Sequence, residues 1–193
     1  MKKFLFIRVM IMLVVVGASW GVIANTTYAA TLSMKNAPLK EGDGREKLGQ
    51  RLPSMILKGL NGKTYDVGAT RNKALVISFW ASWCDPCRLE APMLNELYSK
   101  YKDVVDVYGI NVTRYDRLED VQKFSRSLDL RFPILLDEQG ALFERFGGVA
   151  FPTHVMVDPH GQVREIIIGM LSEKELERKI EILQKKKVSL GAE

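Results

Sequence analysis

Apolar and polar residues alternate in blocks along the chain, and the blocks predict strands separated by helices. Residues 74–80 (Ala-Leu-Val-Ile-Ser-Phe-Trp) are almost continuously apolar, which is typical of a central strand buried on both faces. Residues 104–112 form a second buried strand of this kind. Between them, apolar side chains at three- and four-residue spacing predict a helix over residues 87–101. This apolar series comprises Leu89, Met93, Leu94, Leu97 and Tyr101.

Shorter elements flank this centre. Residues 55–58 and 64–67 predict two strands joined through Asn61-Gly62, a strong hairpin signal. A second hairpin is predicted at the C-terminal side, from residues 153–157 and 163–168. The remaining predictions are a helix at 117–128 with Leu118, Val121, Phe124 and Leu128 on one face, an extended segment at 132–137, a short helix at 141–146, and a last helix capped by Ser172 and Glu175. Together they predict an α/β fold, a mixed central sheet with helices on both faces.

The first residues have the features of an export segment. Lys2 and Lys3 precede the charge-free, mostly apolar run Val9–Ala24, and Thr27-Tyr28-Ala29 offers small residues for a signal peptidase. We interpret residues 1–29 as a signal peptide, with an uncleaved membrane anchor as the alternative. The run of 16 residues is shorter than the roughly 20 needed to span a bilayer. Either interpretation places the folded part outside the cytoplasm.

We expect three segments after the export signal. Residues 30–50, rich in Gly, Lys and Glu, are predicted to be a linker, residues 51–186 the folded domain, and residues 187–193 a tail. The formal charge of +5 overstates the basicity of this domain, because Lys2, Lys3 and Arg8 belong to the export segment. Nothing in the composition indicates a nucleic-acid partner.

The chain contains two cysteines, Cys84 and Cys87, between a predicted strand and a predicted helix. An exported protein with one closely spaced pair has no spare thiol for a structural bridge, and so small a loop gains little stability from closure. The N-terminus of a helix favours a thiolate, which is the nucleophile in disulfide exchange. Cys84 is therefore expected to attack and Cys87 to resolve the mixed disulfide. Pro86 fits the first helical turn, where no backbone donor is needed.

Several motifs together resemble those of the TlpA/ResA-like group of exported thioredoxin-fold thiol–disulfide oxidoreductases. They are the run 79–87 (Phe-Trp-Ala-Ser-Trp-Cys-Asp-Pro-Cys), the helix that carries Pro92, and Phe151-Pro152-Thr153 before the second hairpin. The similarity covers roughly residues 52–182. It implies a thioredoxin fold with an N-terminal β-hairpin and an inserted helix and strand within residues 113–135.

The resemblance also implies how a substrate binds. The proline at the position of Pro152 is cis in this group, and the backbone before it pairs with an extended substrate chain. Trp83 is expected to be an exposed platform for the substrate, whereas Trp80 is expected in the core. We predict that Trp83, Asp85, Pro86, Phe151 and Pro152 form the substrate-binding surface. His154, which follows Thr153 into the strand, is expected to be a packed strand residue outside the site.

Glu90 is the third expected catalytic residue. Ser78 occupies the strand position where cytoplasmic thioredoxins carry a buried aspartate, and in the ResA-like group a glutamate at the position of Glu90 takes part in the acid–base chemistry of the cysteines. A carboxylate near the thiols would disfavour their ionised form and could accept the proton of the resolving cysteine.

The expected function is that of an exported disulfide reductase. Asp85 places negative charge beside the thiolate, and Asp-Pro offers no cationic stabiliser, so a reducing potential is expected. The resemblance suggests apocytochrome c cysteines as the substrate, within cytochrome c maturation, and a membrane thiol protein as electron donor. We expect a periplasmic or outer-surface location and a monomer without a cofactor or bound metal.

Two alternatives remain. A thiol peroxidase would not need a second cysteine so close to the first. A copper-delivery protein on the same fold usually has a wider cysteine spacing, although two thiolates can hold Cu(I). A zinc site lacks ligands in this chain. Four are normally needed, and besides the cysteines only the histidines His154 and His160 remain.

Overall fold

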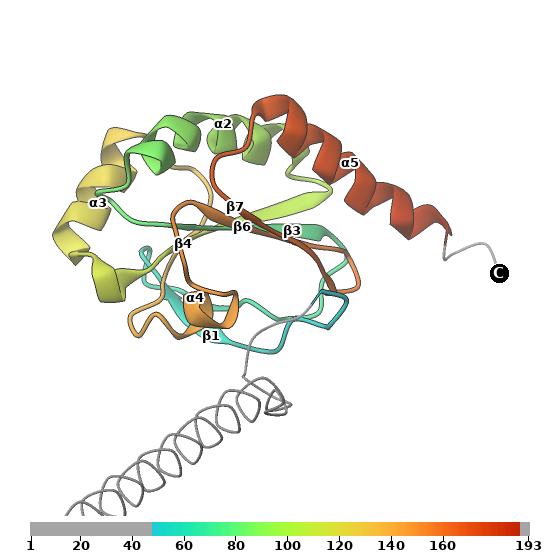
Figure 1. Cartoon of the computed structure of the whole chain (residues 1–193), viewed down its shortest axis with the longest axis horizontal. Helices are drawn as coiled ribbons and strands as arrows, with labels where there is room; N and C mark the ends of the chain where they lie inside the picture. Colours follow the sequence, from blue (N-terminus) through green and yellow to red (C-terminus); the bar gives the residue numbers. More distant parts are fainter. Residues whose placement is uncertain (1–47, 190–193) are drawn as a thin grey trace, which may run out of the picture. The chain divides into compact units, whose positions relative to one another are not determined.

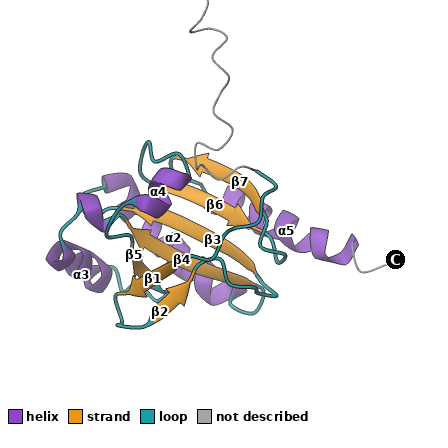
Figure 2. Ribbon diagram, turned by 90° about the horizontal axis from the view of Figure 1, so that it is seen from below, coloured by secondary structure: helices purple, strands orange, loops and turns teal. Residues whose placement is uncertain are grey.

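A seven-stranded mixed sheet runs through residues 48–189, the part of the chain that the computed structural model describes, with side chains placed through residue 184. The strands lie in the order β2-β1-β5-β4-β3-β6-β7 (Figures 1 and 2). Neighbouring strands are parallel between β3 and β4 and between β4 and β5, and antiparallel elsewhere. The strands are β1 (Ile56–Gly59), β2 (Thr64–Asp66), β3 (Ala74–Trp80), β4 (Val105–Asn111), β5 (Ile134–Leu136), β6 (Thr153–Val157) and β7 (Val163–Ile168).

Helices cover both faces of this sheet. Helices α2 (Asp85–Tyr101), α3 (Leu118–Ser127) and α5 (Glu173–Ser189) lie on one face, and the short α4 (Ala141–Arg145) lies on the other (Figure 1). Helix α3 and strand β5 are the inserted helix and strand expected within residues 113–135. Both predicted hairpins are present, β1–β2 and β6–β7. The α/β thioredoxin-type architecture predicted from the sequence is confirmed.

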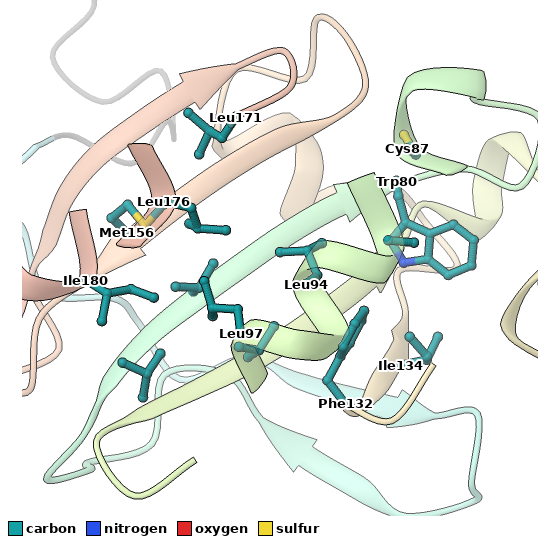
Figure 3. Close-up of a cluster of buried hydrophobic side chains, with 14 of the residues drawn as sticks. Trp80, Cys87, Leu94, Leu97, Phe132, Ile134, Met156, Leu171, Leu176 and Ile180 are labelled. Carbon is teal, nitrogen blue, oxygen red and sulfur yellow. The ribbon is translucent and has the colours of Figure 1, made fainter. Parts of the chain in front are cut away.

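Strand β3 is buried along its whole length because it separates two apolar clusters. Val76 and Trp80 face the cluster under α2, α3 and α5 (Figure 3), whereas Leu75, Ile77 and Phe79 face the cluster under α4. Trp80 is 4% exposed and stacks on Phe124 of α3, with ring centroids 4.5 Å apart. This explains the unbroken apolar run, and the prediction that Trp80 is a core residue is confirmed.

The start and the apolar face of α2 differ from the prediction. The helix begins at Asp85 rather than at residue 87, because the sulfur of Cys84 serves as its N-terminal cap. Leu89 is 73% exposed, although it was expected on the buried face. Leu94 lies five positions further along the helix, which places the two side chains about 140° apart around the axis. The buried positions of the helix are Cys87, Glu90, Ala91, Leu94, Asn95 and Leu97.

The segment before α3 also differs. A short 3-10 turn, η1 (Thr113–Tyr115), precedes the helix, and the extended residue Arg117 is its N-cap, so the helix starts one residue later than predicted. Val121 and Phe124 are buried as expected, whereas Leu118 is 42% exposed because it lies in the first turn at the helix end.

Both ends of the folded part extend beyond the predicted boundaries. The N–H of Gly49 donates to the carbonyl of Val163 at 2.7 Å, and the N–H of Val163 donates to the carbonyl of Gln50 at 2.9 Å, so the last two residues of the predicted linker pair with the start of β7. At the other end, α5 continues three residues past residue 186. Its predicted capping box is present, since the backbone N–H of Ser172 donates to the carboxylate of Glu175 at 2.9 Å and the backbone N–H of Glu175 donates to the hydroxyl of Ser172 at 3.3 Å.

The predicted signal segment, residues 1–29, and most of the linker lie outside the described residues, as does the end of the tail. Within residues 48–189, no helix is long and apolar enough to cross a membrane.

Candidate active site

The strand directions gather the predicted motifs at one edge of the sheet. Strands β3 and β4 are parallel, so the loops that follow them lie side by side. Strand β6 runs antiparallel to β3, with Thr153 opposite Phe79, so its first residues lie at the same edge. The loop with Cys84, the turn after β4 and the segment before Thr153 therefore converge.

Cys84 and Cys87 are joined by a disulfide with an S–S distance of 2.02 Å. The sulfur of Cys84 accepts the backbone N–H of Cys87 at 3.2 Å, and Asp85 and Pro86 occupy the exposed first turn of α2. Each cysteine is 5% exposed. When the disulfide opens, the Cys84 sulfur faces the unpaired N–H groups at the positive end of the helix dipole, which favours a thiolate there.

An aromatic contact joins the cysteine loop to the segment that contains Pro152. The ring of Trp83 packs edge-on against Phe151 at 5.6 Å, and Phe151 stacks on Phe143 of α4 at 4.7 Å. The indole N–H of Trp83 donates to the carbonyl of Tyr115 at 2.9 Å, yet the side chain remains 61% exposed. Trp83 is thus held by two contacts while most of its side chain stays open to solvent, as a platform requires.

The Phe151–Pro152 peptide bond is cis, as the resemblance implied. The hydroxyl of Thr153 donates to the carbonyl of Ala150 at 2.7 Å, and the N–H of Gly169 donates to the carbonyl of Pro152 at 2.8 Å. These bonds fix the segment from both sides. The structure therefore brings Phe151 and Pro152 beside the cysteine loop through Trp83.

Glu90 lies in the interior, 3% exposed, rather than on the helix surface. Glu90 lines a small cavity that Cys87 and Ser78 also line. One carboxylate oxygen, Oε1, accepts the backbone N–H of Leu171 at 2.9 Å. The other oxygen, Oε2, has no hydrogen-bond partner.

His154 contacts this carboxylate, which the sequence did not reveal. The residue is fully buried on β6, as expected of a packed strand residue, but its Nε2 lies 3.1 Å from Oε1 of Glu90. The contact lacks the alignment of a hydrogen bond, and Nδ1 has no partner either. In the sheet, His154 pairs in register with Ser78 of β3, a neighbour that no local sequence pattern indicates.

Asp116 is a second residue that the sequence analysis did not single out. Its carboxylate accepts the backbone N–H and the hydroxyl of Ser82, each at 2.6 Å, and the side-chain amide of Asn111 at 2.8 Å. Asn111 is completely buried at the end of β4. Asp116 therefore ties the loop that precedes Cys84 to the neighbouring strand, and no local sequence pattern predicts such a long-range bond.

A buried carboxylate also supports the aromatic contact. Asp137 is 2% exposed and accepts the backbone N–H of Phe143 at 2.9 Å. Burial raises the pKa of Asp137, while the backbone N–H groups at the start of α4 act in the opposite direction. The carboxylate thus anchors the helix whose Phe143 stacks on Phe151.

Among residues 48–184, no three His, Cys, Asp or Glu side chains gather in a group that could hold a metal ion.

Comparison with known proteins agrees with this geometry. Residues 48–166 match the model of the AhpC/TSA family. The chain is 32% identical to "Thioredoxin-like protein YneN" of Bacillus subtilis over 153 residues, which is 79% of this chain and 85% of that protein. It is 29% identical to "Thiol-disulfide oxidoreductase ResA" of Bacillus cereus over 177 residues, 91% of this chain and 94% of ResA.

Solved structures show the same fold. The exposed lipoprotein thioredoxin Etrx1 of Streptococcus pneumoniae superimposes with a TM-score of 0.62 at 25% identity, covering 67% of this chain and 98% of Etrx1. The similarity in sequence, in fold and in the cysteine pair leads to one conclusion. The chain belongs to the AhpC/TSA family and is a thioredoxin-fold thiol–disulfide oxidoreductase of the TlpA/ResA-like group.

Proposed function

We propose that this protein is an exported disulfide reductase that acts on extracytoplasmic proteins. The observation that carries the proposal is the Cys84–Cys87 disulfide at the start of α2, next to the exposed face of Trp83. The pair can cycle between disulfide and dithiol without a cofactor, because both sulfurs lie in the same helical turn.

The catalytic cycle starts from the dithiol form. The thiolate of Cys84 attacks one sulfur of a substrate disulfide, which releases the first substrate thiolate and leaves a mixed disulfide. Cys87 then loses its proton and attacks the sulfur of Cys84, which releases the second substrate thiolate and forms the Cys84–Cys87 disulfide. Oε2 of Glu90 is the proposed acceptor of the Cys87 proton, because it has no hydrogen-bond partner and Glu90 lines the same cavity as Cys87.

The surface around the disulfide favours a protein substrate. Trp83, Val149 and Met170 are 61%, 70% and 50% exposed, unusually high for such apolar side chains. Val149 precedes the cis-proline segment, and Met170 follows Gly169, which is hydrogen-bonded to Pro152. An exposed apolar rim of this kind is typical of a protein interaction site. We propose that a substrate chain extends along the backbone at Phe151 and Pro152 and rests on Trp83, with Asp85 and Pro86 at its border.

Export and partners follow from the N-terminal sequence and from the relatives. The basic and apolar start of the chain supports export, and one structural relative is described as an exposed lipoprotein. In an oxidising compartment a reductant needs a continuing supply of electrons, so a membrane thiol protein is the proposed donor. Apocytochrome c is the proposed substrate, as the resemblance to the ResA-like group suggests.

The family match favours one second candidate, a thiol peroxidase, because the AhpC/TSA model spans residues 48–166. The close resolving cysteine argues for disulfide exchange. We therefore expect the reduced protein to cleave the disulfides of insulin with a larger second-order rate constant than it shows toward hydrogen peroxide. Both rates are measured by stopped flow on the same dithiol preparation. Faster oxidation by peroxide than by the protein disulfide would support the peroxidase instead.

A further inference from the structure

Glu90 and His154 form a buried pair next to the resolving cysteine. Both side chains are at most 1% exposed, and Nε2 of His154 lies 3.1 Å from Oε1 of Glu90. They come from α2 and β6, elements far apart in the sequence. Burial of an imidazole and a carboxylate is unfavourable unless each compensates the other, so the pairing calls for a functional reason.

The buried carboxylate of Glu90 has few polar contacts. The backbone N–H of Leu171 is its one hydrogen-bond donor, which is little compensation for a desolvated carboxylate. At 3.1 Å, two bare lone pairs on Oε1 and Nε2 would repel, so a proton must lie on one of these atoms. With that proton on Nε2, the imidazole stabilises the carboxylate through Oε1, and Oε2 keeps no hydrogen-bond partner.

The pair is otherwise isolated from charge. In the described part of the chain, three other polar side chains line the cavity with Glu90: Ser78, the titratable Cys87 and Trp80, whose indole N–H has no hydrogen-bond partner. The remaining side chains that line it, from α2, α3 and the segment before β5, are apolar. His154 lies between Ser78 on β3 and Ile167 on β7 in the sheet register. A negative charge on Glu90 therefore acts chiefly on the thiol of Cys87.

We propose that His154 is a positioning residue that keeps Glu90 ionised and, through Glu90, sets the pH range in which the Cys84 and Cys87 thiols ionise. The inference rests on the proposed function insofar as Glu90 takes part in the thiol chemistry. The inference predicts the direction of the effect. A nearby carboxylate raises the free energy of the thiolate, which makes the dithiol form a stronger reductant. Loss of His154 leaves the Leu171 N–H as the one polar contact of the desolvated Glu90, which disfavours the charged carboxylate and weakens its effect on the thiols.

The test is the pH profile of iodoacetamide alkylation of the reduced full-length protein. His154→Phe keeps a ring of similar size without nitrogen atoms, and it is expected to move the profile to lower pH by about one unit, which is about tenfold faster alkylation on the rising limb. Glu90→Gln should move it in the same direction. In the double variant, His154→Phe should add no further shift, because it acts through Glu90. Met156→Leu, on the same face of β6, is the packing control and should leave the profile unchanged.

Three outcomes would overturn the inference: an unchanged profile in His154→Phe, a shift to higher pH, or a shift that persists in the Glu90→Gln background. His154→Leu replaces the phenylalanine variant if that protein does not fold. The comparison needs only the dithiol form. If the wild-type protein had an oxidising potential, the reductase assignment would be wrong. The comparison of the variants' alkylation profiles would still test the role of His154.

Discussion

Replacing Cys84 with serine is expected to reduce the rate of disulfide reduction to that of the uncatalysed reaction, whereas Cys87→Ser is expected to accumulate a mixed disulfide with the substrate. Cys84 caps α2, where the backbone N–H groups favour a thiolate, and serine cannot supply that nucleophile at neutral pH. Cys87 acts only in the second step, so its loss leaves the first attack intact and removes the route to release. Insulin reduction and non-reducing mass spectrometry measure the two effects.

The composition of the chain makes this comparison unusually clean. Cys84 and Cys87 are its only cysteines, so any covalent adduct of a single variant must lie on the remaining sulfur. A stable adduct on Cys87 in the Cys84→Ser variant, together with none on Cys84 in the Cys87→Ser variant, would reverse the assigned order of attack. Both variants should retain the fold, because the disulfide closes a loop too short to add much stability.

Glu90→Gln is expected to move the alkylation profile of the reduced protein to lower pH by about one unit. The carboxylate is 3% exposed and shares a cavity with Cys87, so its charge opposes thiolate formation with little screening by water. Glutamine keeps the length of the side chain and an oxygen for the Leu171 N–H, but it carries no charge. The profile is measured with iodoacetamide over the neutral and alkaline range.

Glu96→Gln provides the matched control for this prediction. Glu96 lies on the same helix but is exposed to solvent, so removal of its charge should leave the profile in place. Equal shifts in the two variants would show a general effect of net charge, and no shift in either would reduce Glu90 to a structural residue.

The parts of the fold that the sequence predicted well are those in which local pattern and tertiary environment agree. Strand β3 matches its prediction from Ala74 to Trp80. A strand that is buried on both faces needs a continuous apolar run, and this requirement does not depend on which strands lie beside it. The hairpin at Asn61-Gly62 depends on turn chemistry within a few residues, and Gly62 indeed has a positive φ of 78°.

The parts that the sequence missed depend on contacts between distant segments. Leu89 fits the apolar spacing of the helix in the sequence. The position of the sheet decides which face of the helix is buried, however, and Leu89 lies on the exposed face. Nothing near His154 in the sequence indicates a carboxylate, because Glu90 reaches it from another element. Asp116 looks like a loop residue until the parallel pairing of β3 and β4 sets it beside Ser82.

The central claim is that the Cys84–Cys87 pair works as a reductant, and its equilibrium redox potential tests that claim most directly. The measurement uses the purified full-length chain equilibrated with a thiol–disulfide buffer, with the dithiol fraction followed by alkylation. The account predicts a value near or below that of thioredoxin, about −270 mV. A value close to that of DsbA, about −120 mV, would contradict it and would assign the protein to oxidation or isomerisation of disulfides.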